Sequence, residues 1–281
     1  MRLAVNGGTP IEDQDSLVIL ADKTFQPGSV DYDGAIAASY SAARSYSAET
    51  ADLWAGVVEP FISQVGAVTV LDVGCGTGRF SNLFAERFQA RVIGLDPALA
   101  MLRSATKAAA RANLCYAAAR GEEIPLCDAC CDLAWLSQVI HHITDRKACA
   151  RELRRVLKPG GYVLIRGAFA DRLDAFPTLL RFFPGTREFM LQFPTVEQVL
   201  ADFRYAGFFL EKAERVRQKT CDNLAEFAER TRLRADSTLS LLADEEFEQC
   251  QSALEQAARE EPPEPVVEII ELLALRTPPR K

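Results

Sequence analysis

A short apolar run followed at once by three closely spaced glycines constrains the fold of this chain more than any other feature. Residues 68–73 are apolar or β-branched except for Asp72, which is typical of a buried strand. Glycines at positions 74, 76 and 78 then let the backbone turn sharply, and a helix is expected from about Arg79 to Phe88. A strand, a turn and a helix in this order bring the backbone close to a ligand beneath a helix N-terminus.

The spacing of the glycines separates two classes of nucleotide-binding protein. The dinucleotide fingerprint G-x-G-x-x-G, started at Gly74, needs a glycine at position 79, where this chain has Arg79. An acid precedes the turn instead, so that Asp72, Gly74, Gly76 and Gly78 form an acid-x-Gly-x-Gly-x-Gly motif. This motif resembles the first motif of the class I S-adenosylmethionine-dependent methyltransferases. An NAD-dependent oxidoreductase is an alternative, because it would share the strand and the turn.

A second motif carries the same resemblance. Residues Arg151 to Leu153 and the stretch Val-Leu-Lys-Pro-Gly-Gly at 156–161 closely resemble the post-catalytic motif of the small-molecule members, the methyltransferase type 11 group, about eighty residues beyond the first motif. The resemblance implies a Rossmann-like, doubly wound α/β sheet of seven strands whose last strand is antiparallel. It also implies S-adenosylmethionine as the cofactor and a small molecule as the acceptor, methylated on an O, N or C atom.

The pattern of apolar, glycine and proline residues divides the chain into elements that fit this fold. We expect an N-terminal arm at 1–29 with a short strand near 17–20, and one methyltransferase domain at 30–281. Residues 168–194 are expected to form a phenylalanine-rich lid or to join the core, and 221–260 a helical insertion whose second helix is capped by Asp244. The expected strands span 68–73, 90–95, 114–118, 132–136, 162–166, 208–219 and 266–276.

Asp96 is the principal predicted contact to the cofactor. It ends the second expected strand, about 20 residues beyond the glycine turn, where a carboxylate can accept hydrogen bonds from both ribose hydroxyls. It can also cap the helix that follows. Pro97 and Met101 would then lie near the adenine, although Met101 fits the core equally well.

A further cofactor segment begins at Gly121 and Glu122. The family often places an acid two positions before the glutamate, but Arg120 stands there and cannot accept a hydrogen bond, so adenine recognition falls to backbone groups around these two residues or to the Glu122 carboxylate.

A segment before the first expected strand is also predicted to contact the cofactor. Family members often carry a tyrosine and arginine stretch before the first strand, and by that resemblance Tyr40 and Arg44 would approach the methionine carboxylate or the reacting centre. A carboxylate suits the planar guanidinium. The alternative is that Tyr40 packs its helix and Arg44 is solvated. The predicted cofactor-binding residues are therefore Tyr40, Arg44, Asp72, Gly74, Cys75, Gly76, Gly78, Asp96, Pro97, Met101, Gly121, Glu122, Ser137 and Gln138.

His141 and His142 are the two histidines of the chain, and they follow the fourth expected strand. Ligands of doubly wound sheets bind beyond the carboxyl ends of the strands, so this pair, with Ser137 and Gln138 just before it, would face the cofactor's methyl group. A neutral imidazole can remove a proton from a hydroxyl or amine at neutral pH. We therefore predict that His142 or His141 is a general base or else orients the acceptor; a structural link between strand and helix is the alternative.

The composition restricts the partners. A formal net charge of −7 disfavours binding to nucleic acid, and the absence of a long apolar run disfavours a membrane span. Cysteines at 127, 130 and 131 lack the separated pairs of a zinc site, so no metal is expected, and the use of cysteine suits the cytoplasm. The expected state is a monomer or homodimer. A non-catalytic protein that binds the cofactor or scaffolds a partner is a further alternative.

Overall fold

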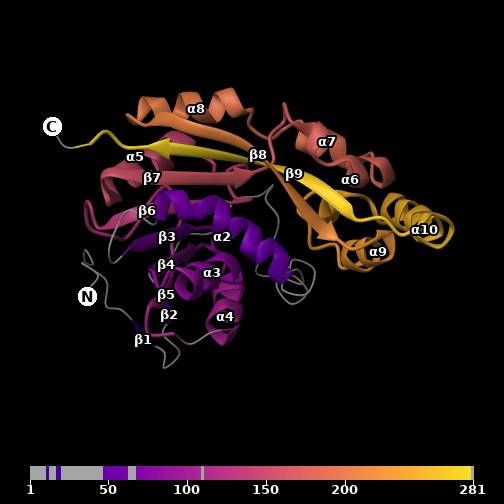
Figure 1. The fold of residues 1–281 in the computed structure, drawn as a ribbon, viewed down its shortest axis with the longest axis horizontal. Coiled ribbons are helices and arrows are strands. Elements are labelled where there is room, and N and C mark those ends of the chain that lie inside the picture. The colour runs from indigo at the N-terminus through magenta and orange to yellow at the C-terminus, as the bar shows by residue number, and fades with distance from the viewer. Residues whose placement is uncertain (1–10, 13–16, 20–46, 63–67, 109–110, 280–281) are drawn as a thin grey trace.

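The computed structural model describes residues 11–12, 17–19, 47–62, 68–108 and 111–279 (Figure 1). Within these residues one sheet has the strand order β1-β2-β5-β4-β3-β6-β7-β9-β8. The strands are β1 Ile11–Glu12, β2 Leu17–Ile19, β3 Thr69–Val73, β4 Arg91–Asp96, β5 Leu114–Ala118, β6 Cys131–Ser137, β7 Leu157–Gly167, β8 Phe209–Cys221 and β9 Val266–Arg276. The helices are α2 Ala48–Ile62, α3 Arg79–Arg87, α4 Leu99–Ala108, α5 Arg146–Val156, η1 Leu173–Ala175, α6 Pro177–Phe182, α7 Thr186–Met190, α8 Val196–Tyr205, α9 Leu224–Arg232, η2 Leu239–Leu241 and α10 Asp244–Glu260.

The seven strands from β3 to β9 confirm the predicted doubly wound sheet. Strands β3 to β7 pair in parallel, and β9 runs antiparallel to both of its neighbours, β7 and β8. The order of strands reverses at β3, which sends β4 and β5 to one side and β6 and β7 to the other. The short strands β1 and β2 extend the sheet beyond β5; a strand near 17–20 was expected, but β1 was not.

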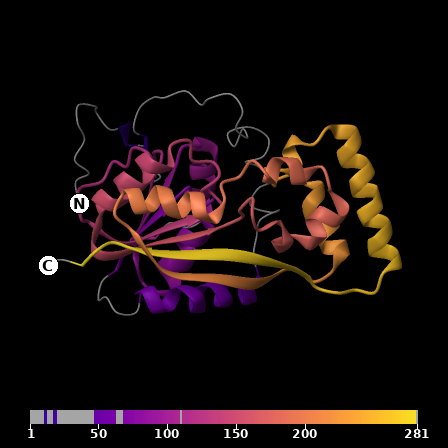
Figure 2. The same ribbon diagram turned by 90° about the horizontal axis from the view of Figure 1, so that it is seen from above.

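Apolar side chains on both faces of the strands explain the three layers. One face packs against α2, α3 and α4, where Trp54, Phe84 and Trp135 are completely buried. The other face packs against α5 and α8 through residues such as Leu153 and Phe203. Helices α2 and α8 accordingly lie on opposite sides of the sheet in Figure 2. Because parallel strands covered on both faces need apolar residues at successive positions, their near-continuous apolar runs are the expected sequence pattern.

Two predicted boundaries were wrong. Strand β7 begins at Leu157 instead of residue 162, because Leu157 pairs with Cys131 and the backbone of 160–161 bonds to residues 277–278. The glycine and proline residues after α5 therefore lie within the strand, with Gly160 at φ 79°. Helix α10 is not capped by Asp244, which is its first helical residue; the N-cap position is held by Ala243.

A helical lobe, defined here as η1, α6, α7, α9, η2 and α10, projects from the carboxyl edge of the sheet (Figure 1). Strand β7 ends at Gly167, opposite Glu271, whereas β8 continues past this level to Cys221 and pairs with the first half of β9. The lobe packs around this extension through a buried core that includes Phe183 stacked on Phe247, with ring centroids 5.7 Å apart. The lobe therefore lies beyond the strand ends where doubly wound sheets bind ligands.

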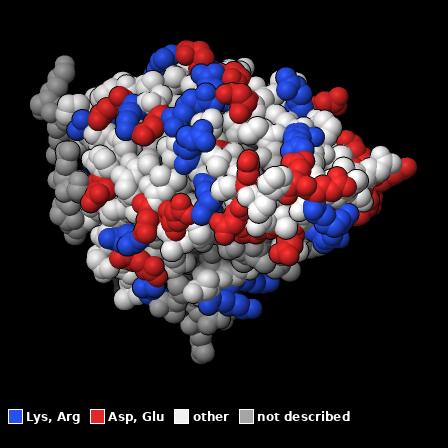
Figure 3. Space-filling view, turned by 45° about the vertical axis from the view of Figure 1, so that its right-hand side comes forward, with Lys and Arg blue, Asp and Glu red and all other residues white. Residues whose placement is uncertain are grey.

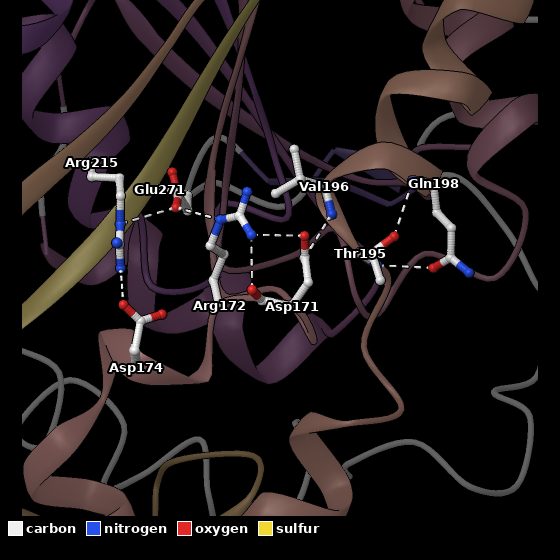
Figure 4. Close-up of polar contacts among 8 residues, drawn as sticks. All are labelled: Asp171, Arg172, Asp174, Thr195, Val196, Gln198, Arg215 and Glu271. Atoms are coloured by element: carbon white, nitrogen blue, oxygen red, sulfur yellow. Dashed lines mark hydrogen bonds and ion pairs between the residues drawn. The ribbon is translucent and has the colours of Figure 1, made fainter.

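A buried carboxylate fixes the lobe to the sheet where the lobe begins (Figure 4). Glu271 on β9 is 5% exposed and accepts a 3.1 Å hydrogen bond from Arg172 Nε. Arg215 Nε on β8 lies 3.3 Å from the same oxygen, and Arg215 Nη2 pairs with Asp174 at 2.7 Å. Burial raises the pKa of Glu271, and the two arginines oppose this rise.

The same network reaches helix α8. Asp171 pairs with Arg172 and accepts a 3.0 Å hydrogen bond from the backbone N–H of Val196. Thr195 and Gln198 complete a capping box at this helix start, as Figure 4 shows. The beginning of the predicted lid is thus joined to β8, β9 and α8 by charged and backbone hydrogen bonds.

Candidate functional site

The glycine turn between β3 and α3 needs residues without a Cβ. Gly78 has φ 74°, and a Cβ there would lie 2.1 Å from the hydroxyl oxygen of Tyr116. Gly74 has φ 68°, and its Cβ would lie 2.4 Å from Val139 Cγ2. The backbone N–H groups of Gly74 and Cys75 donate to Leu95 O at 2.7 and 3.0 Å. The turn is therefore anchored to the end of β4 and closely packed by β5 and the loop after β6.

Asp96 lies at the end of β4, directly beside this turn. Its side chain is 8% exposed, and Oδ2 accepts a 2.8 Å hydrogen bond from the N–H of Gly76. Oδ1 accepts a 2.9 Å hydrogen bond from the N–H of Ala98, which forms an Asx turn just before α4, so the bond does not cap an N–H group within the helix. A carboxylate has about four lone-pair sites, so these two bonds are compatible with the predicted pair of ribose hydroxyls. The structure brings the acid and the glycine turn together as one unit.

Asp72 holds helix α3 to the sheet. Its carboxylate is buried beneath the turn and accepts a 2.6 Å hydrogen bond from Ser81 Oγ on α3. Burial raises the pKa of Asp72 to about 7, and the bond from Ser81 opposes the rise. Burial also raises the pKa of the Cys75 thiol, with smaller contributions from Asp72 and Asp96. These contacts give Asp72 a role in shaping the turn, beside its predicted role in the cofactor site.

The predicted adenine contacts differ in their exposure. Pro97 is exposed in the connection between β4 and α4, whereas Met101 on α4 is only 2% exposed. Gly121 is buried, and a Cβ there would lie 2.9 Å from Cys149 Sγ. Glu122 Oε1 accepts hydrogen bonds from the N–H groups of Thr144 and Asp145 at 3.1 and 3.3 Å. The Glu122 carboxylate thus holds the start of α5 through one oxygen, and the backbone of this segment and this carboxylate both stay predicted adenine contacts.

Strand β6 ends in a constrained turn that is held by β7. Gln138 has φ 55°, uncommon for a residue with a side chain, and its N–H donates to Arg166 O at 2.7 Å. Ser137 Oγ accepts a 3.1 Å hydrogen bond from Arg166 Nη1. Ser137 and Gln138 thus lie at the carboxyl edge next to the end of β3, where they were predicted.

The two histidines follow this turn and contact the end of the predicted lid. The imidazole rings of His141 and His142 are half-buried, with centroids 4.2 Å apart. Phe193 stacks on His141 at 4.1 Å with an interplanar angle of 16°. Phe193 and Phe189 are half-buried, whereas Phe169, Phe176, Phe182 and Phe183 are buried, so most of the phenylalanines expected in the lid belong to the core.

A buried polar group at the same edge was not predicted from the sequence. The guanidinium of Arg166, 5% exposed, donates from Nη2 to Gln218 Oε1 at 2.7 Å. Trp54 Nε1 donates to the same Gln218 oxygen at 2.8 Å. The sequence signal was an arginine after the apolar run Tyr162–Ile165, a charge at the last position of the predicted strand 162–166.

Two further expectations concern residues outside the glycine turn. Tyr40 and Arg44 lie outside the described residues. All eight cysteines are free, with Cys130 Sγ 3.7 Å from Cys131 Sγ. In the described part of the chain, no three or more His, Cys, Asp or Glu side chains are grouped so that they could hold a metal ion.

Comparison with known proteins identifies the family. The profile of a family described as "Methyltransferase domain" matches residues 71–165, which include the glycine turn, Asp96 and the end of β6. A malonyl-(acyl-carrier protein) O-methyltransferase from Erwinia pyrifoliae is 33% identical over 192 residues, covering 64% of this chain and 70% of that protein. The chain belongs to the class I S-adenosylmethionine-dependent methyltransferases. This membership overturns the alternative of an NAD-dependent oxidoreductase.

Other relatives of this chain are matched over shorter regions. A trans-aconitate 2-methyltransferase from an Azoarcus species is 38% identical over 103 residues, 36% of this chain and 39% of that protein. Two more malonyl-(acyl-carrier protein) O-methyltransferases are matched over 40% and 51% of their own lengths. Among solved structures, the (4+2)-cyclase SpnF has a TM-score of 0.61 at 23% identity, with 85% of each chain covered, which shows a shared fold.

Replacing Gly78 by alanine tests the packing of the turn in this methyltransferase. We expect Gly78→Ala to lower the free energy of unfolding by about 2–4 kcal/mol, because it adds left-handed strain to a clash with Tyr116. Gly207→Ala is the matched control, since Gly207 has φ 87° with open space around it, and strain alone costs about 1–2 kcal/mol. Urea unfolding measures both. Equal losses in the two variants would contradict the close packing of the turn.

Proposed function

We propose that this chain transfers a methyl group from S-adenosylmethionine to a carboxylate oxygen of a small molecule. The observation that carries the methyl-transfer proposal is the unit formed by the glycine turn and Asp96, in which the carboxylate accepts from Gly76 N–H at the carboxyl edge of the sheet. The family membership and the two sequence motifs support it. The cofactor, when bound, would supply a methyl group already activated by a sulfonium.

The residues at this edge divide the work of binding. Asp96 would accept hydrogen bonds from the ribose, and the turn at residues 74–78 would let the nucleoside approach the backbone beneath α3. Gly121 and its neighbours would contact the adenine, Ser137 and Gln138 would face the methyl group, and Tyr40 and Arg44 would bind the methionine end. Since the methyl group needs no further activation, the protein contributes mainly by positioning the two reactants.

The names of two relatives support an acid as the acceptor. One is named for O-methylation of malonyl-(acyl-carrier protein) and the other for methylation of trans-aconitate, and both malonyl and aconitate carry carboxylates. We further propose that the lobe covers the acceptor, as the predicted lid at 168–194 and insertion at 221–260 would. Its position beyond the carboxyl edge and the contact of Phe193 with His141 support this arrangement.

A carboxylate acceptor changes the role of the histidine pair. A carboxyl group with a pKa near 4 is already ionised at neutral pH, so it needs no general base, whereas a hydroxyl or amine does. Of the two predicted roles for His141 and His142, base or orienting group, the carboxylate acceptor favours the orienting role. The stacking of His141 on Phe193 supports it, because it joins the loop after β6 to the segment that directly follows α7 of the lobe.

A small soluble acceptor also suits the surface. On the face shown in Figure 3, the Lys and Arg side chains are interspersed with Asp and Glu. They therefore form no continuous basic surface for nucleic acid on that face. None of the helices that the structure describes is long and apolar enough to cross a membrane. The eight free cysteines support the cytoplasm as its location.

Calorimetric titration tests the cofactor site. We expect the chain to bind S-adenosylmethionine and S-adenosylhomocysteine but not NADH, and Asp96→Ala to weaken both affinities about 100-fold because two charge-assisted hydrogen bonds are lost. Asp128→Ala is the control, since Asp128 is an exposed carboxylate at the opposite edge of the sheet. Binding of NADH alone, or equal affinities in Asp96→Ala and the wild type, would contradict the proposal. Binding without any turnover across an acceptor panel would favour a non-catalytic protein.

The pH dependence of the rate tests the role of the histidines. With trans-aconitate or a malonyl thioester as acceptor, we expect the wild-type kcat to vary little between pH 6 and 8, and His141→Ala to lower kcat/KM about tenfold through loss of the ring contact. His142→Gln, which leaves the contact of His141 with Phe193 in place, should retain most of the rate, whereas His141→Gln also lacks the ring and should lose about as much as His141→Ala. A rate that rises near pH 6.5 in the wild type but not in one of the glutamine variants would instead identify a base.

A further inference from the structure

The buried guanidinium of Arg166 lies beside the predicted acceptor position. Arg166 is the next-to-last residue of β7, in register with Ser137 at the end of β6. Its Nη1 donates to Ser137 Oγ at 3.1 Å, so the cation reaches the strand end that the sequence predicts to face the methyl group. Placing a 5% exposed arginine at a strand end requires specific partners, because desolvating a cation is unfavourable.

Aromatic rings and two polar side chains are among the contacts of this cation. Its Cζ lies 4.6 Å from the centre of the Trp54 ring and 5.4 Å from that of Phe80. Gln218, on the part of β8 that projects past the sheet, accepts from Nη2 at 2.7 Å. Helix α2, helix α3 and the projecting part of β8 thus converge on one guanidinium. Attraction between this charge and an anion is stronger here than in water, because the surroundings are of low polarity.

The geometry of the guanidinium suits a carboxylate. It carries five N–H donors in one plane, and its bonds to Ser137 and Gln218 are compatible with a further paired contact to two carboxylate oxygens. The two aromatic faces and the two hydrogen bonds fix the plane of the group before any ligand binds. A fixed donor pair loses little side-chain entropy on binding, which favours affinity.

The strand order places Arg166 on the acceptor side of the site. Asp96 lies on β4 and Arg166 on β7, with β3 and β6 between them. Neighbouring strands are about 4.8 Å apart, so about 14 Å of the sheet edge separates the predicted ribose contact from the arginine. The nucleoside would occupy the β4 and β3 end of this edge, which leaves the β6 and β7 end for the acceptor.

We propose that Arg166 binds a carboxylate of the methyl acceptor, so that the acceptor is recognised as an acid. This inference rests on the proposed function and specifies the residue that selects the substrate class. Gln218 and Trp54 act as positioning residues that hold the guanidinium plane. An amide or ester of the same shape makes a poorer ligand, because it offers fewer acceptor sites and no negative charge.

Titration of the chain saturated with S-adenosylhomocysteine tests the inference, with malonate as the probe and malonamide as its neutral counterpart. We expect malonate to bind and malonamide to bind about tenfold or more weakly. Arg166→Gln should weaken malonate about 10- to 100-fold while the affinity for S-adenosylhomocysteine stays within about twofold. Arg166→Lys should lie between them, because it keeps the charge and loses the paired donors. Arg204→Gln, on the exposed surface of α8, is the matched control.

A second variant keeps the test independent of the folding of Arg166→Gln. Gln218→Glu keeps the size of the side chain and the acceptor for Trp54, but it puts a carboxylate against the guanidinium and should weaken malonate about tenfold. Equal affinities for malonate and malonamide in the wild type, or unchanged malonate affinity in folded Arg166→Gln, would overturn the inference. Loss of S-adenosylhomocysteine affinity in Arg166→Gln equal to the loss for malonate would overturn it too, by assigning the arginine to the cofactor's carboxylate. Failure of the wild type to bind S-adenosylhomocysteine would contradict the proposed function itself, and with it this inference.

Discussion

The bond from Gly76 N–H to the Asp96 carboxylate is the interaction on which the rest of the site depends. It joins the first two parallel strands at their carboxyl ends and fixes a turn whose glycines have no room for a Cβ against Tyr116 and Val139. The buried Asp72, bonded to Ser81, holds α3 above the same turn. One loop therefore determines the approach of a ligand, the start of a helix and the spacing of β3 and β4.

The second constraint is the length of β8 and β9. Because both strands continue past Gly167, a lobe can fold beyond the carboxyl edge without a separate linker. Glu271, between Arg172 and Arg215, fixes the beginning of this lobe to the sheet. The extension also carries Gln218 back to Arg166. The strands that close the sheet thus help to build the side of the edge that we propose for the acceptor.

Much of the fold could be predicted from the sequence, because buried parallel strands have continuous apolar runs and glycine marks their turns. The seven main strands and the insertion before β9 were predicted in this way. The start of β7 was not, because its pairing with Cys131 and residues 277–278 is a long-range contact that local glycine and proline residues obscure. At the site, Asp96 could be predicted from its spacing, whereas Arg166 could not, because only the folded structure brings it to Ser137, Trp54 and Gln218.

A crystal structure of the chain with bound S-adenosylhomocysteine is the most direct test of this account. The account predicts the ribose hydroxyls within hydrogen-bonding distance of the Asp96 carboxylate and the sulfur near Ser137, with the lobe over the β6 and β7 end of the edge. A nucleoside bound elsewhere, or one whose ribose does not contact Asp96, would contradict the central claim that this acid and the glycine turn form the cofactor site.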